Sequence, residues 1–421
     1  MKVTITPAKL KGRVKAIASK SAAHRLLICA ALADRPTEIL CEELSRDIEA
    51  TAESLKQMGA EISYDRERGV FYVNPIRDLS GACTMDVGES GSTLRFLLPV
   101  VCALGLRAHI VMHGRLGERP LSPLWEELER HGCRLVRNKD GSVDTEGRLK
   151  GGEFRIAADV SSQFISGLLF ALPLLKEPAS IRLYGNVESE GYIRMTISAL
   201  EQFGLKTMWQ GDVLAVCAAD ADAGEEPIRI GYRSPGSVRT EGDWSNAAFW
   251  EIAGMLSDGG TGGLLSTGLN EASIQGDRAV RELKMKIAAG NAVIDARNVP
   301  DLVPVLSVLA AAVPGNTTFT HAERLRIKES DRIISTVNMI RALGGDAEET
   351  ADGLIVRGKE RLRGGRVNSC NDHRIAMSAA VMSIACEDQV VIDGAEAVAK
   401  SYPAFWEDFE KLGGKILCED Y

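Results

Sequence analysis

The chain has 421 residues, with 50 Lys and Arg against 58 Asp and Glu, a formal net charge of -8 and 45% hydrophobic residues. That length suffices for two domains of about 200 residues each. The negative charge argues against nucleic acid or an anionic membrane as the main partner. We find no signal peptide and no apolar run of about 20 residues, the length that spans a bilayer, so we expect a soluble, cytoplasmic protein.

Nine cysteines are scattered along the chain without a CxxC pair. An odd number without metal-ligand spacing indicates reduced, mostly buried thiols. The sequence therefore favours neither a zinc site nor a disulfide framework.

A recurring local pattern divides the chain into similar parts. Six times a predicted helix runs into a glycine that is followed by an extended segment, at Gly59, Gly132, Gly204, Gly290, Gly344 and Gly413. Glycine suits the residue after a helix, where a positive φ is cheap only without a β-carbon. The glycines are 54 to 86 residues apart, too far for a short-period solenoid, so we expect six small α/β modules.

A second helix recurs in every module, with a polar start and an apolar body. The starts are Ser19-Lys20-Ser21, Glu89-Ser90-Gly91-Ser92, Ser161-Ser162-Gln163, Asp243-Trp244-Ser245-Asn246, Pro300-Asp301 and Asn371-Asp372-His373-Arg374. Bodies such as residues 168–175 and 302–313 are apolar on nearly all sides, which indicates helices buried within a domain. Exposed N-termini of such helices carry free N–H groups and a partial positive charge, so they suit anionic ligands, above all if the six converge.

Strand-like segments lie between the helices, at Val3–Thr6, Gly69–Val73, Ala108–Met112, Glu153–Ile156 and Leu354–Val356. The alternation of strand and helix indicates the α/β or α+β class. An acidic loop at 218–226, followed by Ser234-Pro235-Gly236, separates three modules from three. We expect one domain of residues 20–239 and one of residues 1–19 plus 240–421, with the N-terminal strand paired into the second half.

Basic residues cluster beside the helix starts, at Lys20, Arg25, Arg95, Arg119, Lys328, Arg332, Arg374 and Lys400. Some would fall there by chance, but residues 324–332 interleave four cations with two carboxylates at a predicted loop-to-helix junction. Cations at a helix N-terminus oppose the helix dipole unless an anion lies between them. The pattern therefore predicts ligands with two or more phosphate or carboxylate groups.

Eight motifs occur together in one order: Lys20-Ser21-x-x-x-Arg25, Glu89-Ser-Gly-Ser-Thr-Leu-Arg95, Glu118-Arg119-Pro120, Ser161-Ser-Gln163, Pro300-Asp301, Arg326-Ile-Lys-Glu-Ser-Asp-Arg332, Asn371-Asp-His-Arg374 and Ala399-Lys400. In order and spacing they resemble the 5-enolpyruvylshikimate-3-phosphate synthase family over essentially the whole chain. The resemblance implies a monomer of two inside-out α/β barrels, three modules each, with the active site in the interdomain cleft. It implies transfer of the enolpyruvyl group of phosphoenolpyruvate to shikimate 3-phosphate, with release of phosphate, no cofactor, and glyphosate as an inhibitor.

The resemblance also assigns residues, position by position. For phosphoenolpyruvate it implies Lys20, Gly91, Arg119, Gln163, Arg332, Arg374 and Lys400. For shikimate 3-phosphate it implies Lys20, Ser21, Arg25, Ser161, Ser162, Gln163, Ser189, Tyr192, Asp301, Arg324 and Lys328. In catalysis, Asp301 would accept the proton of the 5-hydroxyl, Glu329 would protonate the methylene carbon, and Lys20 would assist.

Several of these residues also have a purely structural interpretation. Asp301 could be only a helix N-cap, and Glu329 could merely pair with neighbouring cations. Ser189 and Tyr192 could only cap a helix, and we read His373 as structural rather than as a proton carrier.

Two positions depart from the usual family pattern. Glu89 and Arg324 both stand where many members have Asn. We leave Glu89 out of the ligand set, because a carboxylate beside an anionic substrate must be paired. Arg324 remains as an extra contact to the substrate phosphate.

Two competing functions remain to be weighed. UDP-N-acetylglucosamine enolpyruvyl transferases share the fold, but they typically have Lys-Asn at the first motif and a cysteine-bearing loop. Here the first motif is Lys20-Ser21, and residues 113–120 contain no cysteine. An anion-binding module that has lost catalysis would lack Asp301 or Glu329, and both are present.

Overall fold

The structure is a computed structural model that describes residues 1–79, 81–218 and 231–419. The chain folds as two compact units, unit 1 comprising Met1–Ile17 with Glu241–Tyr421 and unit 2 comprising Ala18–Thr240. The sequence-based divisions, at 19/20 and 239/240, lie close to these points. Apart from Ala218, the acidic loop expected at 218–226 lies outside the described residues.

Unit 2 contains three four-stranded sheets of one topology, in which the first two strands are parallel and the others antiparallel. In sheet order the strands are β14 (Ser237–Arg239), β3 (Thr37–Leu40), β5 (Val70–Asn74) and β4 (Glu61–Asp65); β6 (Ala82–Asp86), β7 (Arg107–Val111), β9 (Val143–Gly147) and β8 (Cys133–Arg137); and β10 (Gly152–Ala157), β11 (Ala179–Tyr184), β13 (Val213–Ala218) and β12 (Leu205–Gln210).

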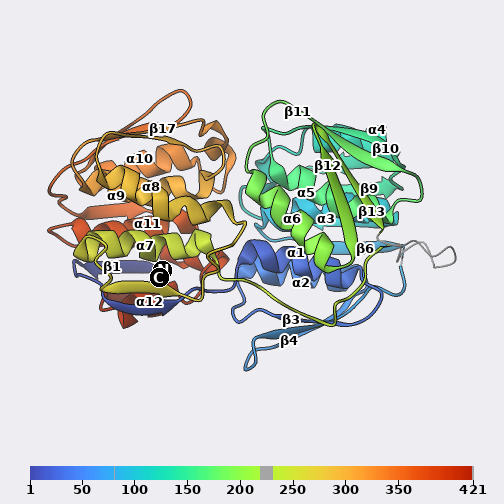
Figure 1. The fold of residues 1–421 in the computed structure, drawn as a ribbon, viewed down its shortest axis with the longest axis horizontal. Helices are drawn as coiled ribbons and strands as arrows, with labels where there is room; N and C mark the ends of the chain where they lie inside the picture. The colour runs from blue at the N-terminus through green and yellow to red at the C-terminus, as the bar shows by residue number, and fades with distance from the viewer. Residues whose placement is uncertain (80, 219–230, 420–421) are drawn as a thin grey trace. The chain divides into compact units, whose positions relative to one another are not determined.

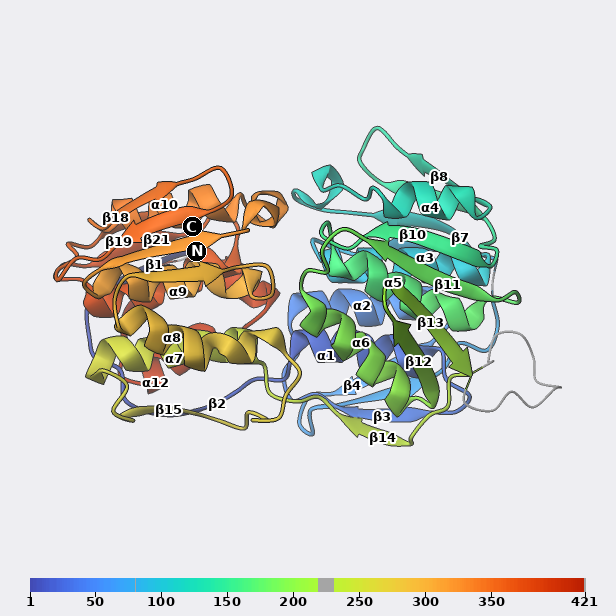
Figure 2. The same cartoon turned by 45° about the horizontal axis from the view of Figure 1, so that its top comes forward.

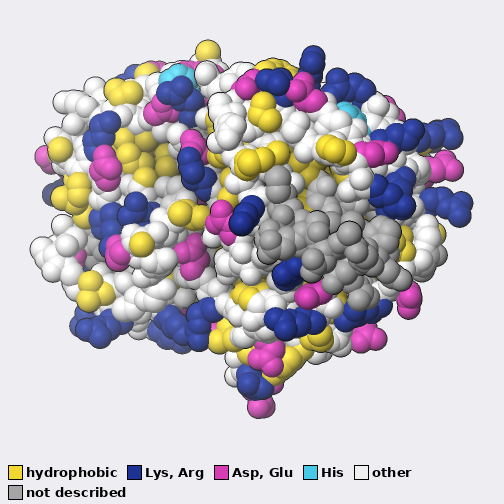
Figure 3. All heavy atoms as spheres, turned by 45° about the vertical axis from the view of Figure 1, so that its right-hand side comes forward, with side chains coloured by type: hydrophobic (Ala, Val, Ile, Leu, Met, Phe, Trp, Pro, Cys, Tyr) yellow, Lys and Arg dark blue, Asp and Glu magenta, His cyan; other side chains and the backbone are white. Residues whose placement is uncertain are grey.

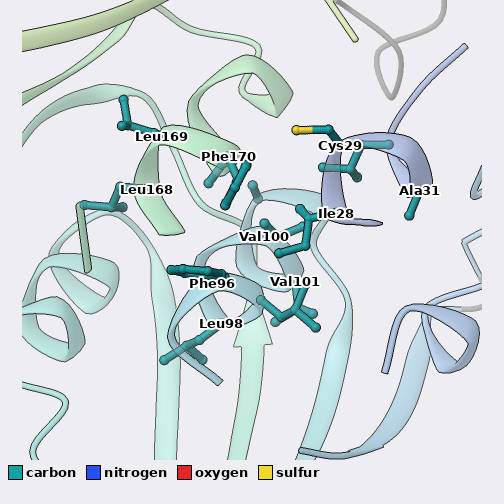
Figure 4. Packing of buried hydrophobic residues seen from close by; sticks show 14 of the residues in the cluster. Ile28, Cys29, Ala31, Phe96, Leu98, Val100, Val101, Leu168, Leu169 and Phe170 are labelled. Carbon is teal, nitrogen blue, oxygen red and sulfur yellow. The ribbon is translucent and has the colours of Figure 1, made fainter. Parts of the chain in front are cut away.

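Figures 1 and 2 show the helices α3 and α5 of unit 2 in its interior, among these sheets. The helices of unit 2 are α1 (Lys20–Ala31), α2 (Arg46–Gln57), α3 (Gly91–Leu104), α4 (Leu124–Arg130), α5 (Ser162–Ala171) and α6 (Glu190–Gln202), with short 3₁₀ turns η1 (Leu116–Glu118) and η2 (Leu172–Leu174). Apolar residues of α1, α3 and α5 pack against one another in the core (Figure 4), where the rings of Phe96 and Phe170 lie 5.7 Å apart. All-round burial explains why these helices carry apolar residues on every face.

Unit 1 repeats the sheet topology with one sheet reduced. In sheet order its strands are β20 (Gly365–Asn368), β21 (Val390–Asp393), β1 (Lys2–Thr6) and β22 (Lys415–Glu419); β16 (Ala292–Asp295), β17 (Asn316–Thr320), β19 (Leu354–Arg357) and β18 (Asp346–Glu349); and the pair β15 (Leu264–Thr267) and β2 (Gly12–Lys15). The N-terminal strand does pair into the second half of the chain, with Val3 opposite Ile392 on one side and Cys418 on the other.

The helices of unit 1 are α7 (Trp244–Asp258), α8 (Val280–Ala288), α9 (Val303–Ala312), α10 (Arg332–Ala342), α11 (His373–Met382) and α12 (Phe405–Lys411). Its 3₁₀ turns are η3 (Gly276–Ala279), η4 (Pro300–Leu302), η5 (Glu323–Ile327), η6 (Ser383–Ala385) and η7 (Ala395–Lys400). Residues of α7, α9 and α11 contribute to a separate apolar core, together with residues of the strands and the other helices of the unit.

The repeat predicted from the six glycines is confirmed, since all six have φ between +77° and +105°. Five lead into the fourth strand of their own sheet. Gly290 instead leads into β16, the first strand of the next sheet, so the module of α7 and α8 has only two strands. This missing hairpin explains why the glycine spacing is least regular around Gly290.

Surface charge, helix hydrophobicity and the grouping of possible metal ligands were each the subject of a sequence-based expectation. On the face drawn in Figure 3, basic and acidic side chains are interspersed rather than gathered by sign. Within the described residues, no helix has the length and apolarity to cross a bilayer, and no three His, Cys, Asp or Glu side chains are grouped to hold a metal ion. Eight cysteines are free thiols: Cys29, Cys41, Cys83, Cys102, Cys133, Cys370, Cys386 and Cys418.

Candidate active site

Side chains cap five of the six helix starts that the sequence singled out. Ser19, Ser90 and Ser161 accept backbone N–H bonds at the starts of α1, α3 and α5, and Asp243 and Asp372 do so for α7 and α11. The start at Pro300-Asp301 differs, because a 3₁₀ turn precedes α9 and no side chain caps either element. Asp301 is therefore not an N-cap, and its carboxylate is committed elsewhere.

Arg332 is the centre of a buried charged cluster in unit 1. Only 2% of its side chain is exposed, and it bonds three carboxylates. Nη1 donates to Asp301 Oδ1 (2.9 Å), Nη2 to Glu329 Oε2 (2.7 Å) and Nε to Asp372 Oδ2 (2.8 Å). Its planar fork allows one cation to hold carboxylates on several sides. The two candidate acid–base residues, Asp301 and Glu329, thus share one guanidinium.

Two further cations lie beside this cluster. Arg374 donates to Asp301 twice, from Nη1 to the backbone oxygen (3.0 Å) and from Nη2 to Oδ2 (3.1 Å). Lys400, at the end of η7, donates to the backbone oxygen of Asn371 (2.7 Å). Cys370 and Asn371 both have positive φ, +54° and +55°, a costly backbone for residues other than glycine. Such strain beside a charged cluster is typical of a functional site.

The electrostatics of the cluster hold Asp301 ionised. Burial opposes its charge, but Arg374, Lys328 and Arg332 outweigh that effect and lower the pKa of Asp301 far below its ordinary value. The neighbouring Asp277, at the start of η3, is 1% exposed and accepts a bond from Ser245. Burial and the charge of Asp301 raise the pKa of Asp277 to about 6. Two nearby carboxylates with pKa values pushed apart are a common feature of active sites.

The other predicted residues of unit 1 lie at the edge of this cluster. Lys328 follows η5 and acts on Asp301 through its charge. Arg324 donates to the backbone oxygen of Arg297 (2.9 Å). His373 is 3% exposed at the first residue of α11, which suits the structural reading given to it.

In unit 2, the first turns of α3 and α5 are joined through Gln163. Its Nε2 donates to Ser92 Oγ (3.0 Å), and its Oε1 accepts from Arg95 Nη1 (3.1 Å). Arg95 and Arg119 close over Gly91, since an ideal β-carbon on that glycine would lie 2.7 Å from Arg95 Nη1 and 2.8 Å from Arg119 Nη1. Two guanidinium groups therefore meet at the N-terminus of α3, where the helix dipole also favours an anion.

A second group of predicted residues gathers around Arg25, which is 3% exposed on α1. Its guanidinium donates to the backbone oxygens of Ser21 (2.6 Å) and Tyr192 (2.9 Å) and to Thr196 Oγ1 (2.8 Å). Burial lowers the pKa of Arg25 to about 10, so the group stays charged at neutral pH. One turn earlier, Lys20 forms an ion pair with Asp47 (2.8 Å).

The remaining predicted hydroxyls lie at two helix starts. Ser161 caps α5 by accepting from Gln163 N (3.3 Å), and Ser162 is its first residue. Ser189 precedes α6 with φ +54° and makes no capping bond, so the capping alternative fails for Ser189. Glu89 lies against the loop that carries Arg119, because an ideal β-carbon on Gly114 would be 2.6 Å from Glu89 Oε2.

Sequence reasoning missed several residues that contact the predicted ones or act on them through charge, among them Asp47, Ser92, Asp277 and Asp372. Asp372 and Ser92 lie inside motifs already singled out, so their position was a usable signal. Asp47 and Asp277 lie in segments with no distinctive pattern. Only the fold brings Asp47 to Lys20 and Asp277 to Asp301.

Comparisons with known proteins agree in pointing to one family. The family described as EPSP synthase (3-phosphoshikimate 1-carboxyvinyltransferase) matches residues 5–409. A 3-phosphoshikimate 1-carboxyvinyltransferase of Clostridium perfringens (strain ATCC 13124) is 40% identical over 438 residues, covering 99% of this chain and 100% of the relative. One of Clostridium kluyveri is 39% identical, with 98% of each chain covered.

Solved structures show the same fold at lower identity. An EPSP synthase from Acinetobacter baumannii superposes with a TM-score of 0.77 at 22% identity, covering 99% of this chain and 100% of that one. The enolpyruvyl transferase NikO from Streptomyces tendae gives a TM-score of 0.75 at 17% identity, covering 99% of this chain and 98% of that one. These likenesses show the fold of two inside-out α/β barrels. With the extent of the sequence match, they show that the chain belongs to the EPSP synthase (3-phosphoshikimate 1-carboxyvinyltransferase) family.

Proposed function

We propose that this protein catalyses the family reaction through the two residue sets described above. It transfers the enolpyruvyl group of phosphoenolpyruvate to the 5-hydroxyl of shikimate 3-phosphate and releases phosphate. The observation that carries the proposal is the pair of carboxylates, Asp301 and Glu329, held by the single guanidinium of Arg332 at 2.9 and 2.7 Å. This reaction needs both a proton acceptor and a proton donor.

The chemistry divides into an addition and an elimination. The 5-hydroxyl oxygen attacks C2 of phosphoenolpyruvate while C3 gains a proton, and the hydroxyl proton leaves. The adduct then loses phosphate from C2 and a proton from the new methyl group, which restores the double bond. We assign acceptance of the hydroxyl proton to Asp301 and protonation of C3 to Glu329.

Asp301 is ionised, and the positive charges of Arg374, Lys328 and Arg332 stabilise its carboxylate and lower its pKa. A carboxylate stabilised in this way is a weak base. Substrate anions that bind the same cations would offset their charge and raise the basicity of Asp301. We therefore propose that anion binding activates the base, which ties proton transfer to a loaded site.

The substrate anions are assigned to the cations by chemistry. Arg119, Arg332, Arg374, Lys400 and Lys20, with Gln163 and the backbone at Gly91, would hold the phosphate and carboxylate of phosphoenolpyruvate. Shikimate 3-phosphate is assigned to Ser21, Arg25, Ser161, Ser162, Gln163, Ser189, Tyr192, Arg324 and Lys328, with Lys20 and Asp301. Each set draws residues from both units, and we propose that the two sets act on one pair of substrates. We expect the enzyme to work as a monomer in the cytoplasm.

Phosphate release from phosphoenolpyruvate tests the function directly. We expect release with shikimate 3-phosphate and none with UDP-N-acetylglucosamine. Release only with the nucleotide sugar would assign the chain to the other enolpyruvyl transferase. No release with either acceptor would leave an anion-binding module.

A further inference from the structure

A chain of buried polar side chains in unit 2 is not part of the substrate-binding and catalytic assignments above. It consists of His24 on α1, Thr51 on α2, Thr93 on α3 and Ser90, the N-cap of α3, each at most 1% exposed. His24 Nδ1 lies 2.7 Å from Thr51 Oγ1, which lies 2.6 Å from Thr93 Oγ1, which lies 2.7 Å from Ser90 Oγ. We call these four residues the His24 chain.

The protons of the His24 chain can be placed in one direction. Ser90 Oγ accepts from both the backbone N–H (3.2 Å) and the hydroxyl of Thr93. Because a hydroxyl carries one hydrogen, Thr93 Oγ1 must then accept from Thr51, and Thr51 must accept from His24. His24 is therefore the neutral tautomer with its proton on Nδ1. Its Nε2, buried with no hydrogen-bond partner, carries only a lone pair.

The surroundings of His24 keep the ring neutral. Burial, and then the charges of Lys20 and Arg25, lower the pKa of His24 well below its ordinary value. The ring meets Phe96 of α3 edge to face, with centroids 6.4 Å apart, and the Arg25 guanidinium lies over the same Phe96 ring at 4.9 Å. The imidazole is thus a fixed hydrogen-bond donor that packs on α3 as well.

The His24 chain ends at the peptide that precedes Gly91. Ser90 caps α3, and the next residue, Gly91, lies beneath Arg95 and Arg119. Gln163 ties the first turn of α3 to α5 through Ser92, whereas the His24 chain ties the same turn to α2 and α1. On α1, His24 directly precedes Arg25 and lies one turn after Lys20.

We propose that His24, Thr51 and Thr93 are positioning residues that hold the Ser90–Gly91 peptide where phosphoenolpyruvate binds. The inference rests on the proposed assignment of Gly91 and Arg119 to phosphoenolpyruvate. A buried hydrogen bond that is lost without replacement allows the cap, and with it the α3 N-terminus, to shift. The expected consequence is weaker binding of phosphoenolpyruvate with little change for shikimate 3-phosphate.

Three variants on α2 isolate the hydroxyl in the middle of the chain. Thr51→Val removes it and keeps the shape, Thr51→Ser restores it, and Ser54→Ala removes a buried hydroxyl of the same helix that has no hydrogen-bond partner. We expect Thr51→Val to raise KM for phosphoenolpyruvate by about three- to tenfold, the equivalent of one or two buried hydrogen bonds. In Thr51→Val, KM for shikimate 3-phosphate and kcat should stay unchanged. The kinetics of Thr51→Ser and Ser54→Ala should resemble those of wild type.

Equal changes of both KM values, or a Ser54→Ala variant as impaired as Thr51→Val, would overturn the positioning role. Thr93→Val, which leaves the backbone bond to Ser90 in place, provides a second variant and should shift the same KM. Arg119→Ala separates the two hypotheses, because unchanged KM for phosphoenolpyruvate in that variant would refute the site assignment and not the chain.

Nitrogen NMR of the histidine side chains tests the His24 chain without reference to activity. With ¹⁵N-histidine label and assignment by loss of the signal in His24→Gln, His24 should be neutral and protonated on Nδ1 at neutral pH. A proton on Nε2 or a charged ring would overturn the proton arrangement, and with it the proposal.

Discussion

Arg119 lies directly over Gly91, with Nη1 2.8 Å from the place where a β-carbon on that glycine would be. Arg95 Nη1 lies 2.7 Å from the same place. A side chain at position 91 would therefore meet two guanidinium groups before it met a ligand. This relationship determines what a substitution at Gly91 is expected to do.

Gly91→Ala should weaken the binding of phosphoenolpyruvate as well as that of glyphosate. The family resemblance places this inhibitor on the same residues. We expect KM for phosphoenolpyruvate to rise about fivefold, the low end of overpacking costs, because a guanidinium on a flexible side chain can move. The inhibition constant of glyphosate, the larger ligand, should rise further. Steady-state kinetics with both ligands measure the two effects.

Gly117→Ala is the matched control for this substitution. Gly117 lies in the same loop as Arg119, and the nearest atom to its ideal β-carbon is at 3.7 Å. The variant should behave as wild type. An unchanged KM in Gly91→Ala would mean that Arg119 does not hold phosphoenolpyruvate.

Asp301→Asn and Glu329→Gln should each lower kcat by roughly 10² to 10⁴, the usual contribution of a general acid or base. Binding of shikimate 3-phosphate should stay largely intact, which calorimetry can check. Glu349→Gln is the control, because Glu349 pairs with Arg326 (2.9 Å), outside the cluster. Turnover within threefold of wild type would remove the substituted residue from the mechanism.

Local parts of the fold could be predicted because single residues determine them. The six glycines predicted helix ends with positive φ, and Ser19, Ser90 and Ser161 predicted helix starts, because each signal acts within one turn of the chain. The reduced module of α7 and α8 was not predicted. Its glycine looks like the others, and only strand pairing shows that Gly290 leads into the next sheet.

The cluster around Arg332 shows where sequence reasoning stops. Cations near helix starts predicted an external anion, but the protein itself supplies three carboxylates, Asp301, Glu329 and Asp372. Two of these are far from Arg332 in sequence, so charge patterns along the chain could not pair them. Motif resemblance named the residues, and tertiary structure supplied their partners.

Asp277→Asn should stabilise the protein above pH 6. The pKa of Asp277 is raised from 3.8 to about 6 in the folded state, so wild type loses stability as pH rises from about 4 through 6, when the buried carboxyl ionises. Asparagine avoids that loss. The difference in unfolding free energy should grow from near zero at pH 4 to on the order of 1–3 kcal/mol at pH 7.

Chemical denaturation of both proteins at several pH values measures this difference. Asp346→Asn is a suitable control, because Asp346 is 46% exposed and pairs with Arg357 at the surface. A difference for Asp277→Asn that does not change between pH 4 and pH 7 would contradict a raised pKa.

Asp372 has two functions that substitution can separate, because its carboxylate both caps α11 and pairs with Arg332. It accepts from Arg374 N (2.9 Å), from Ser330 Oγ (3.0 Å) and from Arg332 Nε (2.8 Å). Asparagine keeps a capping oxygen but removes the charge. We expect Asp372→Asn to cost about 1–3 kcal/mol of stability, the penalty for poorly satisfied buried groups, and to raise KM for phosphoenolpyruvate as Arg332 shifts.

Asp372→Ala should cost about 1 kcal/mol more than Asp372→Asn, because it also removes the cap. Asp331 provides the matched control, since it caps α10 through Ile334 N (3.1 Å) and pairs with the partly exposed Arg326 at 3.3 Å. Asp331→Asn keeps the cap and loses only a partly exposed ion pair, which is worth about 1 kcal/mol or less. Denaturation and KM for phosphoenolpyruvate measured on all three variants test this account. If Asp372→Asn changed stability and KM no more than Asp331→Asn does, the only role of Asp372 would be to cap α11. Asp301 and Glu329 would then hold Arg332 without it.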